Sequence, residues 1–144
     1  MIGGVEVVIL VDQYNLPEDI FEIIFATSQQ KIVGKVLINT FKSNNGEMTK
    51  TEMSLFATSL HEGNLVTQID EEPYKGKNVK LSYNKRQFYD RILTPMRSMG
   101  MIDYDLYRRA YKLSDSFSKL VLKIGQMWTK EIRKQEIGFA VKTE

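Results

Sequence analysis

The segment from Asn84 to Ser114 constrains the fold more than any other part of this chain. Asn84 is placed to cap a helix, and Gly100 is placed to end it, because glycine readily adopts the left-handed backbone that closes helices. Two short strands joined by a tight turn at Tyr104-Asp105 are expected next, and Ser114 then caps another helix. The expected strands are Met101–Asp103 and Leu106–Leu113.

The helix after Asn84 has one apolar side and one internal proline. Gln87 occupies the position from which a side chain can return the cap. Proline inside a helix costs about 3 kcal/mol unless a new turn begins there, and Thr94 is placed to cap such a turn before Pro95. We therefore predict a kink or break at this point. The apolar stripe consists of Phe88, Ile92, Leu93, Met96 and Met99.

Five elements are expected before this segment. Val5–Val11 is a β-branched run typical of a strand, and Pro17 opens a short helix to about Ala26. Ser28 is expected to cap a longer helix that reaches Phe41. The Thr49-Lys50-Thr51-Glu52 pattern is a capping box, and it predicts a helix that ends near Gly63. Residues 62–80 then read as a loop with one short strand, Leu65–Ile69.

The last predicted helix runs from Ser114 to about Arg133, and its apolar stripe is longer than a small core requires. It can pack on its own domain or pair with a second copy. We favour a homodimer formed through this C-terminal helix. The stripe consists of Phe117, Leu120, Val121, Ile124, Met127, Trp128 and Ile132.

Composition excludes several kinds of chemistry in this chain of 144 residues, a length that suits one globular domain. Without cysteine there is no disulfide, thiol nucleophile or thiolate zinc site, and His61 is the single histidine. No phosphate loop or catalytic set is present, so we expect a protein that is not an enzyme, with no metal and no cofactor. The opening apolar run is too short to span a bilayer, so we expect a cytoplasmic protein without membrane contact.

Charge is distributed unevenly along the chain. Residues 1–74 carry 4 Lys/Arg against 11 Asp/Glu, a net charge of −7, whereas residues 75–134 carry 15 against 5, a net charge of +10. A segment this basic suits a polyanionic partner, although the acidic half can also fold against it and cancel the field.

The order of these motifs resembles the second half of a winged helix-turn-helix DNA-binding domain of the MarR-like and PadR-like regulators. The likeness rests on the helix exit Met99-Gly100-Met101-Ile102, the basic strand Arg108-Arg109-Ala110-Tyr111 and the helix start Lys112-Leu113-Ser114-Asp115. It implies a mostly helical α+β fold. We expect a strand and helix extension over 1–28, a winged-helix domain over 29–113, and a dimerisation helix with a tail over 114–144.

The resemblance implies a transcriptional regulator that binds double-stranded DNA. Its recognition helix would lie in the major groove and its basic wing on phosphates. The candidate DNA-binding residues are Tyr83, Asn84, Lys85, Arg86, Gln87 and Arg91 on the helix, and Tyr107, Arg108 and Arg109 on the wing.

One feature departs from the motif. About twenty residues separate the helix at 50–61 from the helix at 84–99, where a turn of about 3–4 residues is usual. Either this segment is an insertion, or another helix takes the positioning role. Two alternatives to a DNA-binding regulator stay open: a winged-helix module that binds a protein partner in a larger assembly, and a regulator that senses a ligand.

Overall fold

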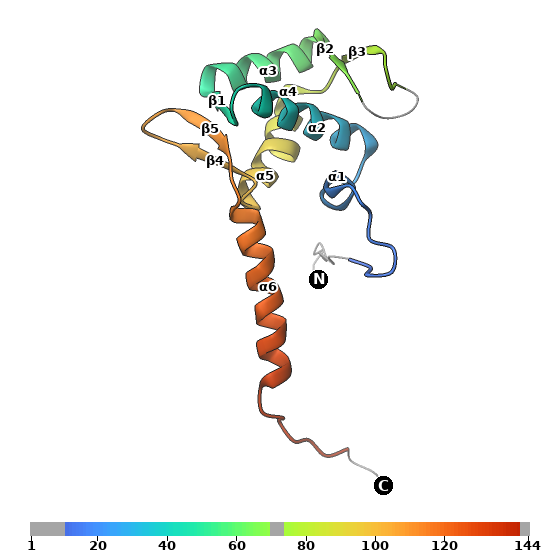
Figure 1. Ribbon diagram of the computed structural model, residues 1–144, viewed down its shortest axis with the longest axis vertical. Helices are drawn as coiled ribbons and strands as arrows, with labels where there is room; N and C mark the ends of the chain where they lie inside the picture. The colour runs from blue at the N-terminus through green and yellow to red at the C-terminus, as the bar shows by residue number, and fades with distance from the viewer. Residues whose placement is uncertain (1–10, 70–73, 142–144) are drawn as a thin grey trace.

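The fold was analysed in a computed structural model that describes residues 11–69 and 74–141. It is a largely helical α+β arrangement with a small antiparallel sheet (Figure 1). The predicted strand Val5–Val11 lies outside the described residues except for Val11, which has no regular structure. The opening helix α1 (Ile20–Ile24) is shorter than expected: Asp19 caps it, its carboxylate accepting the N–H of Phe21 at 2.9 Å.

Helices α2 (Ser28–Ser43) and α3 (Lys50–Glu62) were both expected, with one difference in capping. The cap of α2 is Thr27, whose hydroxyl accepts the N–H of Gln30, whereas Ser28 is already helical. The capping box of α3 is confirmed: Thr49 and Glu52 satisfy each other's backbone N–H groups at 2.9 and 3.0 Å. The short strand β1 (Glu47–Thr49), which sequence periodicity did not indicate, lies directly before α3.

Residues 62–80 hold more structure than the predicted loop with one strand. Strand β2 (Leu65–Gln68) is confirmed, and it pairs antiparallel with β3 (Asn78–Leu81). The chain then returns to the end of α3, where the Tyr83 N–H donates to the Leu60 carbonyl at 2.9 Å. The long segment is therefore a hairpin inserted between two helices whose ends remain in contact.

Of the kink or break predicted at Pro95, the break is wrong, and the helix instead has a π-helical turn directly before the proline. Helix α4 (Lys85–Phe88) continues through one π-helical turn, η1 (Tyr89–Leu93), into α5 (Thr94–Ser98). Proline has no N–H and its ring would meet the carbonyl four residues earlier, and a wider turn relieves that conflict without ending the helix. Thr94 has helical dihedrals and its N–H donates to the Tyr89 carbonyl, so it is not a cap. We call this continuous element the composite helix.

After the composite helix, strands β4 (Ile102–Asp105) and β5 (Ala110–Leu113) form a hairpin. Their connection is Leu106–Arg109, later than the predicted turn at Tyr104-Asp105, because the Asp105 carboxylate accepts the N–H groups of Tyr107 and Arg108 and holds the turn there. Strand β1 pairs with β5, so the three-stranded sheet has the order β1-β5-β4.

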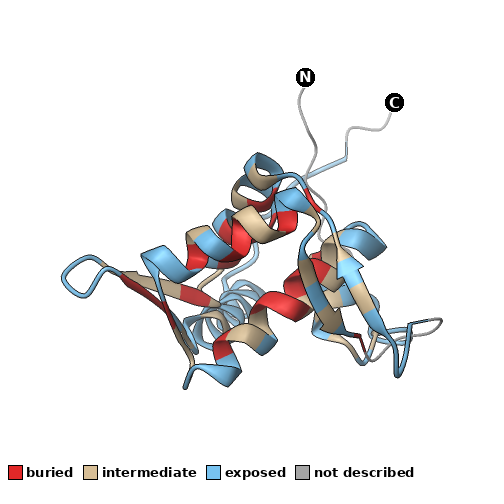
Figure 2. Cartoon of the chain, turned by 90° about the horizontal axis from the view of Figure 1, so that it is seen from above, coloured by how far each residue is buried: buried red, intermediate tan, exposed pale blue. Residues whose placement is uncertain are grey.

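The core lies where α2, α3 and the composite helix meet the inner face of the sheet (Figure 2). Phe41, Met48, Phe56, Phe88 and Met96 are among the side chains buried there. The last helix, α6 (Ser116–Arg133), extends away from this body and contains no buried residue (Figure 1). Its start differs slightly from the expectation, since Asp115 occupies the cap position while the Ser114 hydroxyl accepts the Ser116 N–H.

Candidate nucleic-acid interface

The composite helix has an apolar side in the core and a polar side in solvent. Its buried side chains, including Phe88 and Ile92, hold it against α2 and α3. The opposite side carries cations, hydroxyls, an amide and one carboxylate at helical spacing, and a groove-binding helix requires such a polar, largely basic side. The exposed residues are Arg86, Gln87, Asp90, Arg91, Thr94, Arg97 and Ser98.

The start of the composite helix is fixed by side chains that the sequence pattern had assigned to DNA. Asn84 Oδ1 accepts the Gln87 N–H at 3.0 Å, so Asn84 acts as the helix cap. Lys85 is tied to α3 twice: its N–H donates to His61 Nδ1 at 3.1 Å and its Nζ donates to Thr58 Oγ1 at 3.0 Å. These contacts orient the helix on α3.

Tyr83 departs most from its expected place. Its side chain is only 6% exposed and belongs to the core, because the backbone bond to Leu60 draws this residue against α3. A buried ring cannot stack on a sugar or contact a thymine methyl, so we remove Tyr83 from the candidate interface.

Three arginines of the helix remain available on its exposed side. Arg86 is highly exposed, and Asp90 lies 3.8 Å from its Nε, a loose surface pair worth little. No carboxylate in the described part of the chain lies within 4.0 Å of Arg91 or Arg97. Arg97 was not among the predicted site residues, although it is exposed like Arg91.

The tip of the β4–β5 hairpin carries one exposed aromatic residue and one exposed cation. Tyr107 is fully exposed, and Arg109 is exposed with a positive φ of 49° that turns the chain into β5. The Arg109 carbonyl accepts the Lys50 N–H at 3.0 Å, which anchors the hairpin to the start of α3.

Arg108 is paired rather than free. Its guanidinium donates two hydrogen bonds to the Glu47 carboxylate, at 2.9 and 2.8 Å. This bidentate geometry is the strongest that an arginine makes with a carboxylate, and it neutralises the charge expected to meet phosphate. We therefore do not keep Arg108 as a phosphate contact.

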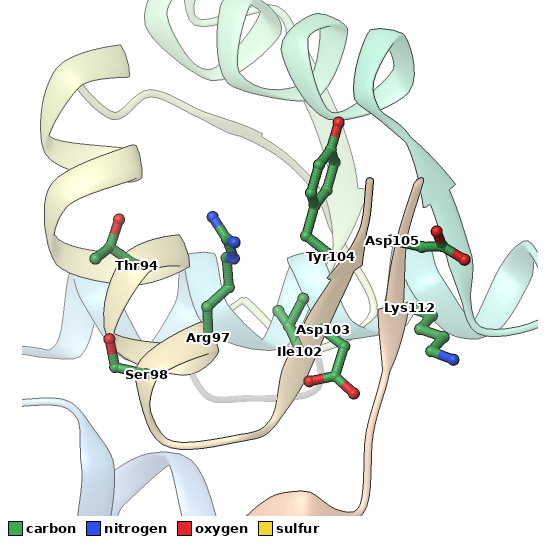
Figure 3. A pocket seen from close by; sticks show the side chains of 8 residues that line it. All are labelled: Thr94, Arg97, Ser98, Ile102, Asp103, Tyr104, Asp105 and Lys112. Carbon is green, nitrogen blue, oxygen red and sulfur yellow. The ribbon is translucent and has the colours of Figure 1, made fainter. Parts of the chain in front are cut away.

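A surface hollow lies between α5 and the edge strand β4, and Figure 3 shows the side chains that line it. The Arg97 guanidinium lies over two rings, 5.5 Å from the centroid of Tyr104 and 5.7 Å from that of Tyr111. Burial raises the pKa of Tyr111, and the charge of Arg97 opposes that rise. Tyr111 is therefore a neutral aromatic surface at physiological pH.

The comparisons with known proteins leave the class of this chain open. No protein-family model, curated protein or solved structure matches it. In the part of the chain that the structure describes, no helix has both the length and the apolar character needed to cross a membrane. Within the same residues, no group of three or more side chains is placed to hold a metal ion.

Proposed function

We propose that this chain is a winged-helix DNA-binding protein and acts as a transcriptional regulator. The observation that carries the proposal is the exposed side of the composite helix, where Arg91 and Arg97, which no described carboxylate approaches within 4.0 Å, lie near a protruding hairpin. The element order supports it: α2, β1, α3, the composite helix, then β4 and β5, with the sheet order β1-β5-β4, is the order that a winged helix requires. The β2–β3 hairpin is then an insertion into the helix-turn-helix.

In this proposal the composite helix enters the major groove. Gln87 and Arg91 approach base edges, with an amide suited to adenine and a guanidinium suited to guanine. Arg86 and Arg109 approach phosphates on either side of the groove, and Tyr107 at the hairpin tip contacts the backbone. Asn84 and Lys85 act indirectly, by holding the start of the helix.

Salt dependence tests the proposal directly. Each phosphate contact contributes about 0.9 to the slope of log affinity against log salt on duplex DNA. We expect Arg91→Ala and Arg109→Ala to weaken binding, and Arg109→Ala to reduce the magnitude of the slope by about that amount. Arg133→Ala is the matched control, because Arg133 lies at the far end of α6 (Figure 1).

A competitor separates DNA recognition from general attraction to acidic partners. Polyglutamate in the same titration should displace little duplex from a DNA-binding protein. Equal competition by polyglutamate, or no binding to duplex of any sequence, would favour the alternative of a module that binds an acidic protein.

We also propose that α6 pairs with α6 of a second copy. The apolar stripe along this helix is open to solvent: Ile124 is 52% exposed and Trp128 is 64% exposed. Helices in proteins gain most of their stability from packing of an apolar face, and no described element of its own body covers this stripe. Two identical stripes cover each other in a coiled coil, which gives the dimer that two half-sites on DNA require.

Sedimentation equilibrium tests the pairing with a matched pair of variants. Ile124→Lys places a charge in the stripe and should give a monomer. Leu122→Lys changes an equally apolar residue, 65% exposed, on the opposite side of α6, and should remain dimeric. Trp128 is the single tryptophan, so its fluorescence reports the same event: emission should shift to the red on dilution as the dimer dissociates. A wild-type monomer at every concentration would refute the pairing.

A further inference from the structure

The Arg97 side chain is held in a way that suits a ligand-binding role. The rings beneath it belong to Tyr104 and Tyr111. Their centroids lie 4.6 Å apart and their planes are tilted by 54° to each other. Tyr111 is buried and Tyr104 packs against the core, so the rings form a fixed surface. Stacking of a guanidinium on a fixed ring reduces the freedom that a long side chain would otherwise lose on binding.

The contact with the rings leaves the hydrogen-bonding groups of Arg97 available. A guanidinium carries five N–H donors in its plane, and an aromatic ring accepts none of them as a carboxylate would. Within the described residues, no hydrogen bond uses those donors, and no carboxylate lies within 4.0 Å of them. Arg108 provides a contrast to Arg97 within the same chain, because its guanidinium already donates hydrogen bonds to the Glu47 carboxylate.

The acidic residues that border the hollow are directed elsewhere. Asp103 lies opposite Lys112 on the neighbouring strand, and it points to the other side of β4 from Arg97 and Tyr104 (Figure 3). Asp105 accepts the N–H groups of the hairpin turn. The hollow is therefore lined by two carboxylates, Asp103 and Asp105, and by two cations, Arg97 and Lys112, and neither carboxylate lies within 4.0 Å of the Arg97 guanidinium.

We infer that Arg97 is a phosphate-binding residue at the junction of the composite helix and the β4–β5 hairpin, and that Tyr104 and Tyr111 position its guanidinium. The inference rests on the proposed DNA-binding function and gives that interface an anchor for one phosphodiester group. Thr94 and Ser98 line the same hollow, and their hydroxyls are typical additional donors to backbone phosphates. Fork geometry matches a phosphate with two oxygens facing it.

Duplex binding over a salt series tests the inference with variants of Arg97. Arg97→Ala should weaken binding about tenfold at low salt and reduce the magnitude of the salt slope by about 0.9. Arg97→Lys should keep the slope, because the charge remains, but lose affinity, because the fork is lost. A residue with a purely structural role would change the melting temperature without changing the slope.

The ring contribution is tested at Tyr104. Tyr104→Phe keeps the ring and should bind like wild type, whereas Tyr104→Leu should weaken binding with the slope kept. Arg133→Ala serves again as the control.

The possible failures are distinguishable. If Arg109→Ala lowers the slope and Arg97→Ala does not, the Arg97 inference is wrong and the DNA-binding proposal stands. If wild-type protein does not bind duplex, both are wrong.

Discussion

Alanine at Gly100 provides a stringent test of how the domain is joined to α6. Gly100 follows α5 with a φ of +82°, a conformation that costs a residue with a side chain about 1 to 2 kcal/mol. An added Cβ would also lie 2.9 Å from the Phe117 nitrogen and 2.9 Å from the Ser116 Cβ. Two of the nearest atoms belong to the backbone of α6, so relief requires the helix to move.

Gly46 is the matched control for this substitution. Its φ of +81° is nearly the same, yet a Cβ added there would meet no atom within 4 Å. Gly46→Ala should therefore cost only the conformational part, about 1 to 2 kcal/mol. Gly100→Ala should cost about 2 to 5 kcal/mol, because overpacking adds about 1 to 3 kcal/mol.

Urea unfolding followed by circular dichroism measures both free energies of unfolding. Backbone hydrogen bonds link this junction, since the Phe117 N–H donates to the Gly100 carbonyl at 2.9 Å and the Ser114 N–H donates to the Met101 carbonyl at 3.0 Å. Equal destabilisation by the two alanines, within about 0.5 kcal/mol, would show that α6 does not pack against Gly100 as described.

Two further substitutions test caps and charge. Thr49→Ala should lower the free energy of unfolding by about 1 kcal/mol, because it removes the capping box of α3. Thr51 is exposed in the first turn of α3, so Thr51→Ala should change the free energy of unfolding far less. Equal effects of the two variants in urea unfolding would contradict the role of Thr49 as a cap. Burial acts to raise the pKa of Asp19, but the hydrogen bond and charge of Lys35 and the Phe21 N–H together lower it below the usual value. This stabilisation is present above the unfolded pKa and is lost as pH falls through the lower folded pKa. Asp19→Asn keeps the cap without the charge, so the difference in free energy of unfolding between this variant and wild type should shrink between about pH 5 and pH 3. A constant difference would contradict the assigned ion pair of Asp19 with Lys35.

The sequence predicted those elements that local chemistry determines. Capping residues and apolar stripes located α2, α3, the composite helix and α6, and Gly100 ended its helix with the expected left-handed backbone. The strands were harder to predict, because a segment of three or four residues shows little periodicity. Strand β1 exists through pairing with β5, a partner about sixty residues away, and β3 exists through pairing with β2.

The candidate interface likewise contains residues whose placement follows from local pattern and residues whose placement depends on contacts between distant parts of the chain. The exposure of Arg86, Arg91 and Arg109 follows from helix periodicity and turn position, and the structure agrees. The pairing of Arg108 with Glu47 joins residues 61 positions apart, so no local pattern could indicate it. Arg97 was missed for a related reason, since the rings beneath it come from two strands that meet it only in the folded chain.

The hydrogen bonds that join the end of α3 to the start of the composite helix have a consequence for sequence variation and protein engineering. Because the Tyr83 N–H and the His61 ring fasten the two helix ends directly, the intervening chain does not set the angle between them. The number of residues between β2 and β3 can therefore change without moving the helix pair, since longer loops add little closure entropy. A reporter peptide or fluorescent label could be introduced between those strands while the exposed arginines keep their places.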